Sequence, residues 1–119
     1  MLVIQSSISS SSAASRFDDV DVIATPTVMH TPHVLTEETG PEKFWARNRG
    51  LVHNLVPVNF LALCAATLPV GLDRLGMPVG LQLIAKGGDD ERLVAIACAA
   101  ELVLGTPRAI LGAPPMCKG

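Results

Sequence analysis

The chain has 119 residues, 49% of them hydrophobic and 17% charged, with a formal net charge of −2. This length allows one domain at most. The nine Lys and Arg residues are scattered and form no clustered basic stretch, so we expect no nucleic-acid partner. No apolar run approaches the roughly 20 residues that span a bilayer, so we expect no membrane segment and a cytoplasmic protein.

The low share of charged residues indicates a piece of a larger core. A small independent domain has a high ratio of surface to volume and usually covers itself with more charge than this. We therefore expect exposed apolar faces, which a partner chain or self-association would cover.

The first part of the chain, residues 1–16, is rich in serine. Such a composition buries too little apolar area to offset the entropy of ordering it, so we expect a flexible leader. Residues 20–25 are then expected to form a buried strand that ends before Pro26, because proline cannot donate a hydrogen bond to a sheet.

A long connection follows at residues 28–43, and it contains four candidate metal ligands: His30, His33, Glu37 and Glu38. A zinc site needs three or four ligands in a defined geometry, and a loop interrupted by proline is poor support for one. We expect a solvated loop and no metal site.

The next segment, residues 42–56, is expected to form one helix that Pro57 ends or kinks. Four of its side chains share one helical stripe, at positions i, i+3, i+4 and i+7: Arg49, Val52, His53 and Val56. A lone histidine is more often a hydrogen-bonded structural residue than a catalytic base, so both roles stay open for His53.

Two strands are expected at residues 66–71 and 79–85, joined by a hairpin loop with Gly71 and Gly76 at its ends. The second strand is apolar on both faces, which is typical of a sheet covered on both sides. A helix at residues 89–104 and an irregular segment at 106–119 complete the expected order of elements. The pattern predicts an α/β fold.

The three cysteines are widely spaced and form no CxxC pair. Cys64 and Cys98 have apolar neighbours in the sequence. We expect them to be buried as small hydrophobic residues with no redox or metal role.

Three blocks of sequence resemble the carboxy-terminal region of the amidase signature family. They are FDDVDVIATPT at residues 17–27, NFLALCAATLPVG at 59–71 and GMPVGLQLI at 76–84. The resemblance extends over about residues 17–115. It implies that residues 17–119 are the carboxy-terminal fragment of the amidase fold, with a mixed β-sheet covered by helices, and that the family reaction is hydrolysis of an amide C–N bond.

The resemblance also implies candidate substrate-binding residues. In the family, a segment like Thr25-Pro26-Thr27 ends a strand near the substrate pocket, although the same residues can simply terminate a strand. Val52 and Val56 fall on positions that line the acyl channel of fatty acid amide hydrolases, or else pack on the sheet. Arg49 and His53 share their stripe, so the full set is Thr25, Thr27, Arg49, Val52, His53 and Val56.

No residue of the chain matches the catalytic groups of the family. These are a nucleophilic serine in a glycine- and serine-rich motif, a second serine with a cis peptide bond and a lysine base, all in the upstream part of the fold. Here no glycine precedes Gly40, and Lys43, Lys86 and Lys118 lie outside any such motif. We expect no catalytic residue and no cofactor.

Three hypotheses for the function remain. The first is the carboxy-terminal segment of an amidase-like hydrolase, inactive alone, which binds a small-molecule amide once the amino-terminal half completes the pocket. The second is a non-catalytic module that complements a partner chain carrying the catalytic half. The third, a stand-alone small-molecule binding domain, is disfavoured by the strands that are apolar on both faces.

Overall fold

A computed structural model describes residues 15–31 and 40–113 of the chain. Among these residues, no helix has both the length and the apolar character needed to cross a membrane. The described elements are, in chain order, η1 (Ser15–Phe17), β1 (Ile23–Pro26), α2 (Pro41–Val52), α3 (Val56–Phe60), β2 (Cys64–Leu72), β3 (Pro78–Ala85), α4 (Asp90–Leu104) and α5 (Pro107–Leu111).

The three strands form one antiparallel sheet in the order β1-β3-β2. The helices and sheet confirm the α/β class, but the prediction of a mixed sheet is wrong for the described strands. β2 and β3 are joined by a short hairpin loop, and such a connection forces antiparallel pairing. β1 pairs with the other edge of β3, also antiparallel, so β1 and β2 run in the same direction but are not paired with each other.

The hairpin loop between β2 and β3 is confirmed, and Asp73 organises it. Its Oδ1 accepts hydrogen bonds from the backbone N–H groups of Leu75 and Met77, both at 2.8 Å. Gly76 has φ +76°, a conformation that favours glycine. β2 begins at Cys64, two residues before the predicted start, because the ladder with β3 continues from Leu72 back to that residue.

β1 is shorter than predicted at its start and includes Pro26 at its end. Residues 20–22 are not part of the ladder, and the exposed Asp21 carboxylate pairs with Arg92 of α4. Pro26 is tolerated because β1 is an edge strand of the described sheet.

The prediction of one helix at residues 42–56 is wrong, because α2 ends at Val52 and α3 begins at Val56. Pro57 explains the break. Its ring would clash with the carbonyl of His53 in a continuous helix, whereas proline is favoured in the first turn of a new one.

The irregular tail predicted after residue 105 is also corrected in part, because residues 107–111 form α5. Thr106 begins this helix, and its hydroxyl accepts a hydrogen bond from the backbone N–H of Ala109 at 3.3 Å. A threonine followed by proline is a typical helix start.

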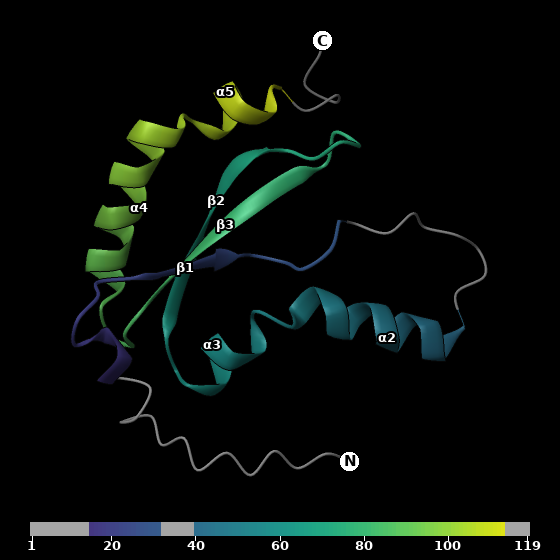
Figure 1. Cartoon of the computed structure of the whole chain (residues 1–119), viewed down its shortest axis with the longest axis horizontal. Coiled ribbons are helices and arrows are strands. Elements are labelled where there is room, and N and C mark those ends of the chain that lie inside the picture. Colours follow the sequence, from purple (N-terminus) through teal and green to yellow (C-terminus); the bar gives the residue numbers. More distant parts are fainter. Residues whose placement is uncertain (1–14, 32–39, 114–119) are drawn as a thin grey trace.

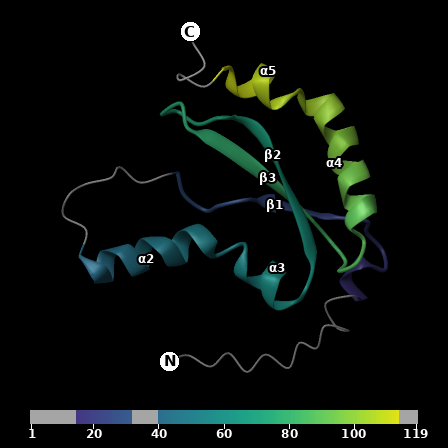
Figure 2. The ribbon, with the colours of Figure 1, turned by 180° about the vertical axis from the view of Figure 1, so that it is seen from behind.

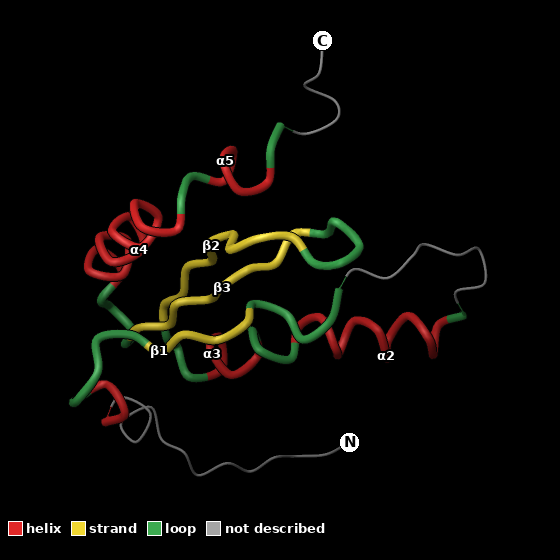
Figure 3. The backbone as a smooth tube through the Cα atoms, turned by 45° about the horizontal axis from the view of Figure 1, so that its top comes forward, coloured by secondary structure: helices red, strands yellow, loops and turns green. Residues whose placement is uncertain are grey.

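Helices lie on both sides of the sheet (Figures 1 and 2). On one face, the core residues Leu83 and Ala85 of β3 pack against Leu93 and Ala97 of α4. On the other side lies α3, and its Val58 is buried. Figure 3 shows the sheet between these two groups of helices, with α2 leading away from α3. Cover is therefore present on the α4 side, whereas the short α3 covers the other side only in part and leaves Ile23 of β1 exposed.

The outer face of α4 is apolar and exposed. Leu102 and Val103 are 88% and 87% exposed. Cys98 is exposed as well, so its predicted burial is wrong; Cys64 is half-buried, and Cys117 lies outside the described residues. The reason is helical periodicity, because Leu93 and Ala97 face the sheet and place Cys98 and Leu102 on other sides of the helix.

The backbone passes very close to itself at Gly87. A Cβ atom at this position would overlap the carbonyl oxygen of Ala62, which is the one non-glycine residue with positive φ (+53°) in the described part of the chain. Because backbone cannot move aside as a flexible side chain does, we expect Gly87→Ala to lower the free energy of unfolding by about 1–3 kcal/mol. Urea denaturation measures the change. Gly71→Ala is the control, since no atom lies within 4 Å of its added methyl group, and equal losses for both variants would contradict the prediction.

The two described cysteines should react at different rates. Burial raises the pKa of the Cys64 thiol, the negative charge of Asp90 raises it further, and the Sγ donates to the Lys86 carbonyl at 3.1 Å. Thiolate is the reactive form and Cys64 is the less exposed of the two, so at pH 8 we expect iodoacetamide to modify Cys98 faster than Cys64. Mass spectrometry of a Cys117→Ser variant measures both rates. Equal rates at the two cysteines would show that burial and the bond to Lys86 do not protect the Cys64 thiol.

Candidate active-site pocket

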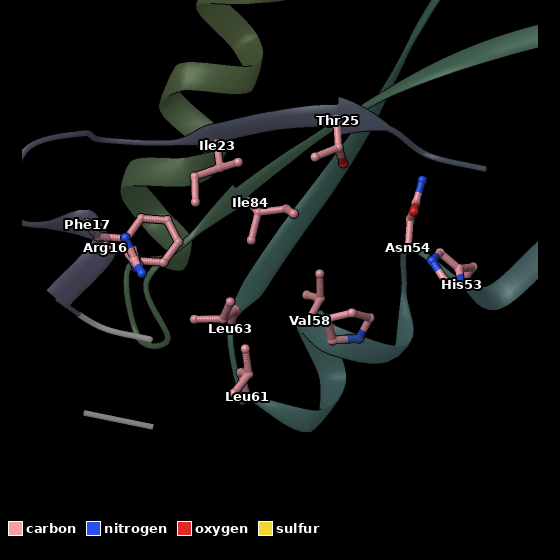
Figure 4. Close-up of a pocket in the computed structure, with 11 residues that line it drawn as sticks. Arg16, Phe17, Ile23, Thr25, His53, Asn54, Val58, Leu61, Leu63 and Ile84 are labelled. Carbon is pink, nitrogen blue, oxygen red and sulfur yellow. The ribbon is translucent and has the colours of Figure 1, made fainter. Parts of the chain in front are cut away.

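A pocket of about 470 Å³ lies on the face of the sheet opposite α4. Figure 4 shows that η1, β1, β3 and the segment around α3 all contribute side chains to it. Most of the lining is apolar, including the side chains of Phe17, Ile23, Val58, Leu61, Leu63 and Ile84. A concave, mainly apolar surface with a few polar groups is typical of a small-molecule site.

One polar end of the pocket is built on β1. The Thr25 hydroxyl donates a hydrogen bond to Oε1 of Gln82 on the central strand at 3.3 Å. Gln82 is 1% exposed and is the buried polar residue of the described core. Thr25 and Thr67 both pair with Gln82 in the sheet register, so a polar row crosses all three strands. Burying a side-chain amide without hydrogen-bond partners costs free energy, and the Thr25 hydroxyl supplies one such partner to Gln82.

The break between α2 and α3 provides the neighbouring polar groups, His53 and Asn54. Asn54 Nδ2 donates to the carbonyl oxygen of Pro26 at 2.8 Å. This bond ties the start of α3 to the end of β1, and so it holds the two polar segments of the pocket together. Figure 4 shows Thr25, Asn54 and His53 on the same side of the pocket.

Arg16 lies on the opposite side of the pocket, next to Phe17 (Figure 4). Within residues 15–31 and 40–113, one ion pair is found, between Asp21 and Arg92. Arg16 therefore has no carboxylate partner among these residues. It is also the one residue of the pocket lining with a permanent charge. The pocket therefore has a permanently cationic side at Arg16 and a second polar side with Thr25, His53 and Asn54, separated by apolar surface.

The structure brings together two of the six predicted substrate-binding residues, Thr25 and His53. Thr27 lies further along, where its backbone N–H donates to Gly80 at 2.9 Å and its hydroxyl donates to Thr67 at 3.3 Å. The other three predicted residues, Arg49, Val52 and Val56, are exposed and do not line this pocket. The helix break separates Val56 from the predicted stripe. Their roles in binding stay predictions.

Arg16 and Asn54 were missed by the sequence reasoning. Arg16 falls at the end of the predicted flexible leader, yet Ser15–Phe17 forms η1. Asn54 falls inside the predicted helix and gave no signal of its own, although Pro57 marks the break that frees it. Only the fold brings these two side chains to one pocket.

No metal centre is found in the parts of the chain that the structure describes, where no three His, Cys, Asp or Glu side chains gather. His30 lies over Gly50 of α2, with its Cδ2 3.2 Å from the position of a Cβ there. The other candidate ligands, His33, Glu37 and Glu38, lie outside the described residues.

The bond between Asn54 and Pro26 gives a stability prediction. We expect Asn54→Ala to lower the free energy of unfolding by about 1 kcal/mol, because it removes a hydrogen bond that links α3 to β1. Asn48→Ala in α2 is the matched control, and we expect a change within about 0.5 kcal/mol. Denaturant unfolding measures both variants. A loss at Asn48 as large as that at Asn54 would show that the link contributes nothing.

Comparison with known proteins identifies the family. Residues 5–94 match the family described as Amidase. The 2-amino-5-chloromuconic acid deaminase of Comamonas testosteroni is 42% identical over 104 residues, which are 87% of this chain and 22% of that protein. The fatty acid amide hydrolase of Medicago truncatula is 35% identical over 91 residues, or 75% of this chain and 15% of that protein.

A third relative is one of the subunits of the glutamyl-tRNA(Gln) amidotransferase of Methanothermobacter thermautotrophicus. It is 44% identical over 78 residues, which are 64% of this chain and 16% of that protein. The chain thus spans 15–22% of the length of these three relatives. Because the family match covers most of the sequence, the chain belongs to the amidase family, as the three sequence blocks predicted.

Proposed function

We propose that this chain is the carboxy-terminal segment of an amidase-type hydrolase, that it provides strands of the sheet and part of the substrate pocket, and that it does not hydrolyse amides alone. The family match over residues 5–94 carries the proposal. The reaction is hydrolysis of an amide C–N bond, and its substrate is a small-molecule amide.

The pocket supports this assignment through its shape and chemistry. Its volume of about 470 Å³ suits a small organic molecule, and its apolar surface ends at two uncharged polar groups, Thr25 and Asn54. In this proposal Thr25 and His53 contact the substrate directly. In this proposal Arg49, Val52 and Val56 contact parts of the substrate that extend beyond this pocket, and Thr27 supports the end of β1.

The catalytic groups come from other polypeptide in this proposal. Amide hydrolysis by a serine enzyme needs a nucleophile, a base and donors for the oxyanion. The sequence has no glycine- and serine-rich motif of the family type, and neither Lys43 nor Lys86 lines the pocket. The role of this chain is therefore to hold the substrate against a catalytic centre built elsewhere.

A second candidate is a module that complements a separate partner chain. Two observations favour it. One relative is by name part of a multi-subunit enzyme, the glutamyl-tRNA(Gln) amidotransferase. In addition, large apolar side chains are exposed on α4 (Leu102, Val103) and on the helix pair (Trp45, Phe60), and soluble proteins seldom leave such surfaces uncovered.

Complementation tests the proposal. The 119-residue chain is co-expressed with the part of the Comamonas testosteroni deaminase that precedes its matching segment, and ammonia release from hexanamide and benzamide is measured. We expect release only from the mixture, and we expect a serine-directed inhibitor to stop it, because the catalytic groups lie in the added polypeptide.

The control joins that same upstream part to the deaminase's own carboxy-terminal segment, assayed on the deaminase's natural substrate as well. An active control beside an inactive mixture would refute the proposed role. Inhibitor-sensitive hydrolysis by the 119-residue chain alone would refute it too.

A further inference from the structure

The two polar sides of the pocket differ in what they offer a ligand. Thr25 has a single hydroxyl proton, and it donates that proton to Gln82 Oε1. Gln82 is on the central strand and is 1% exposed, so this acceptor is held in place. The Thr25 oxygen can therefore only accept a hydrogen bond from a ligand.

Asn54 strengthens this preference. One of its N–H groups is used by the bond to the Pro26 carbonyl, which leaves its side-chain oxygen and one N–H for a ligand. A group with both a donor and an acceptor, such as a carboxamide, matches what remains on Thr25 and Asn54 together. A carboxylate has no proton to donate to the Thr25 oxygen, so Thr25 favours a carboxamide over a carboxylate.

The opposite side of the pocket has the reverse preference. Arg16 is cationic at any physiological pH and has five N–H donors and no acceptor. It has no acidic partner in residues 15–31 and 40–113, and no other lining residue carries a permanent charge. Apolar side chains, among them Ile23 and Ile84, lie between the two polar sides (Figure 4).

We propose that this pocket selects amides whose acyl part carries a second, negatively charged group. The carboxamide binds at Thr25 and Asn54, the apolar body lies on the sheet face, and the anion binds at Arg16. Thr25 is then a specificity-determining residue, and Gln82 is the positioning residue that sets the direction of its hydroxyl. The proposal that the group bound at Thr25 and Asn54 is a carboxamide rests on the proposed function.

Three probes of the same length test the proposal with the full 119-residue chain. They are the monoamide of adipic acid, hexanamide and hexanoate, each titrated by isothermal calorimetry and followed by NMR. We expect the monoamide to bind about threefold to fivefold more tightly than hexanamide, since Arg16 is exposed and its ion pair is screened by water.

Variants separate the two sides of the pocket. Arg16→Gln should remove the advantage of the monoamide over hexanamide, whereas Arg108→Gln on α5, outside the pocket, should leave it unchanged. Thr25→Val should weaken binding of both amides about fivefold and leave hexanoate unaffected. Thr25→Ser keeps the hydroxyl and should restore amide binding, which a merely structural role of the threonine side chain would not predict.

Each contrary result overturns the selectivity. These results are equal affinity for the monoamide and hexanamide, equal effects of Arg16→Gln and Arg108→Gln, or no binding of any probe. If the probes bind as expected but the complemented mixture releases no ammonia beside an active control, the proposed function fails and the selectivity stands. If the mixture hydrolyses hexanamide and the monoamide equally well and Arg16→Gln changes neither rate, the selectivity fails and the function stands.

Discussion

The structure depends on strand β3, because both of its edges and both of its faces are used. β2 pairs with one edge of β3 from Pro78 to Ala85, and β1 pairs with residues 81–84 on the other edge. Leu83 and Ala85 pack on α4, while Gln82 and Ile84 face the other way, toward the pocket side. Alternation along one strand thus separates the core from the candidate site.

Prolines set the boundaries of the elements around β3. Pro57 prevents a continuous helix and lies in the first turn of α3. Asn54 therefore lies in the short break between α2 and α3. Pro26 ends β1 at the sheet edge, and its carbonyl, free of the ladder at this end, accepts the Asn54 side chain. Two residues that cannot donate backbone hydrogen bonds therefore bring the two polar segments of the pocket together.

The composition and the family match both point to an apolar surface that further polypeptide would cover. Half of the chain is hydrophobic, yet the buried core is small, so many large apolar side chains stay exposed on α4 and on the helix pair. The relatives are several times longer than this chain. In the proposed function, the polypeptide that carries the catalytic groups also covers these faces, so burial of apolar area and assembly of the active site occur together.

The sequence alone was enough for the family, the α/β class, the β2–β3 hairpin and the position of α4, because strand alternation, glycine turns and helical periodicity are local signals. It also named Thr25 and His53, which line the candidate pocket. Only the tertiary structure decided that β1 joins the far edge of β3, that Arg16 and Asn54 reach the same pocket and that Cys98 faces outward. These facts depend on contacts between residues far apart in the chain, such as Asn54 with Pro26 and Asp21 with Arg92, and no local pattern encodes such pairs.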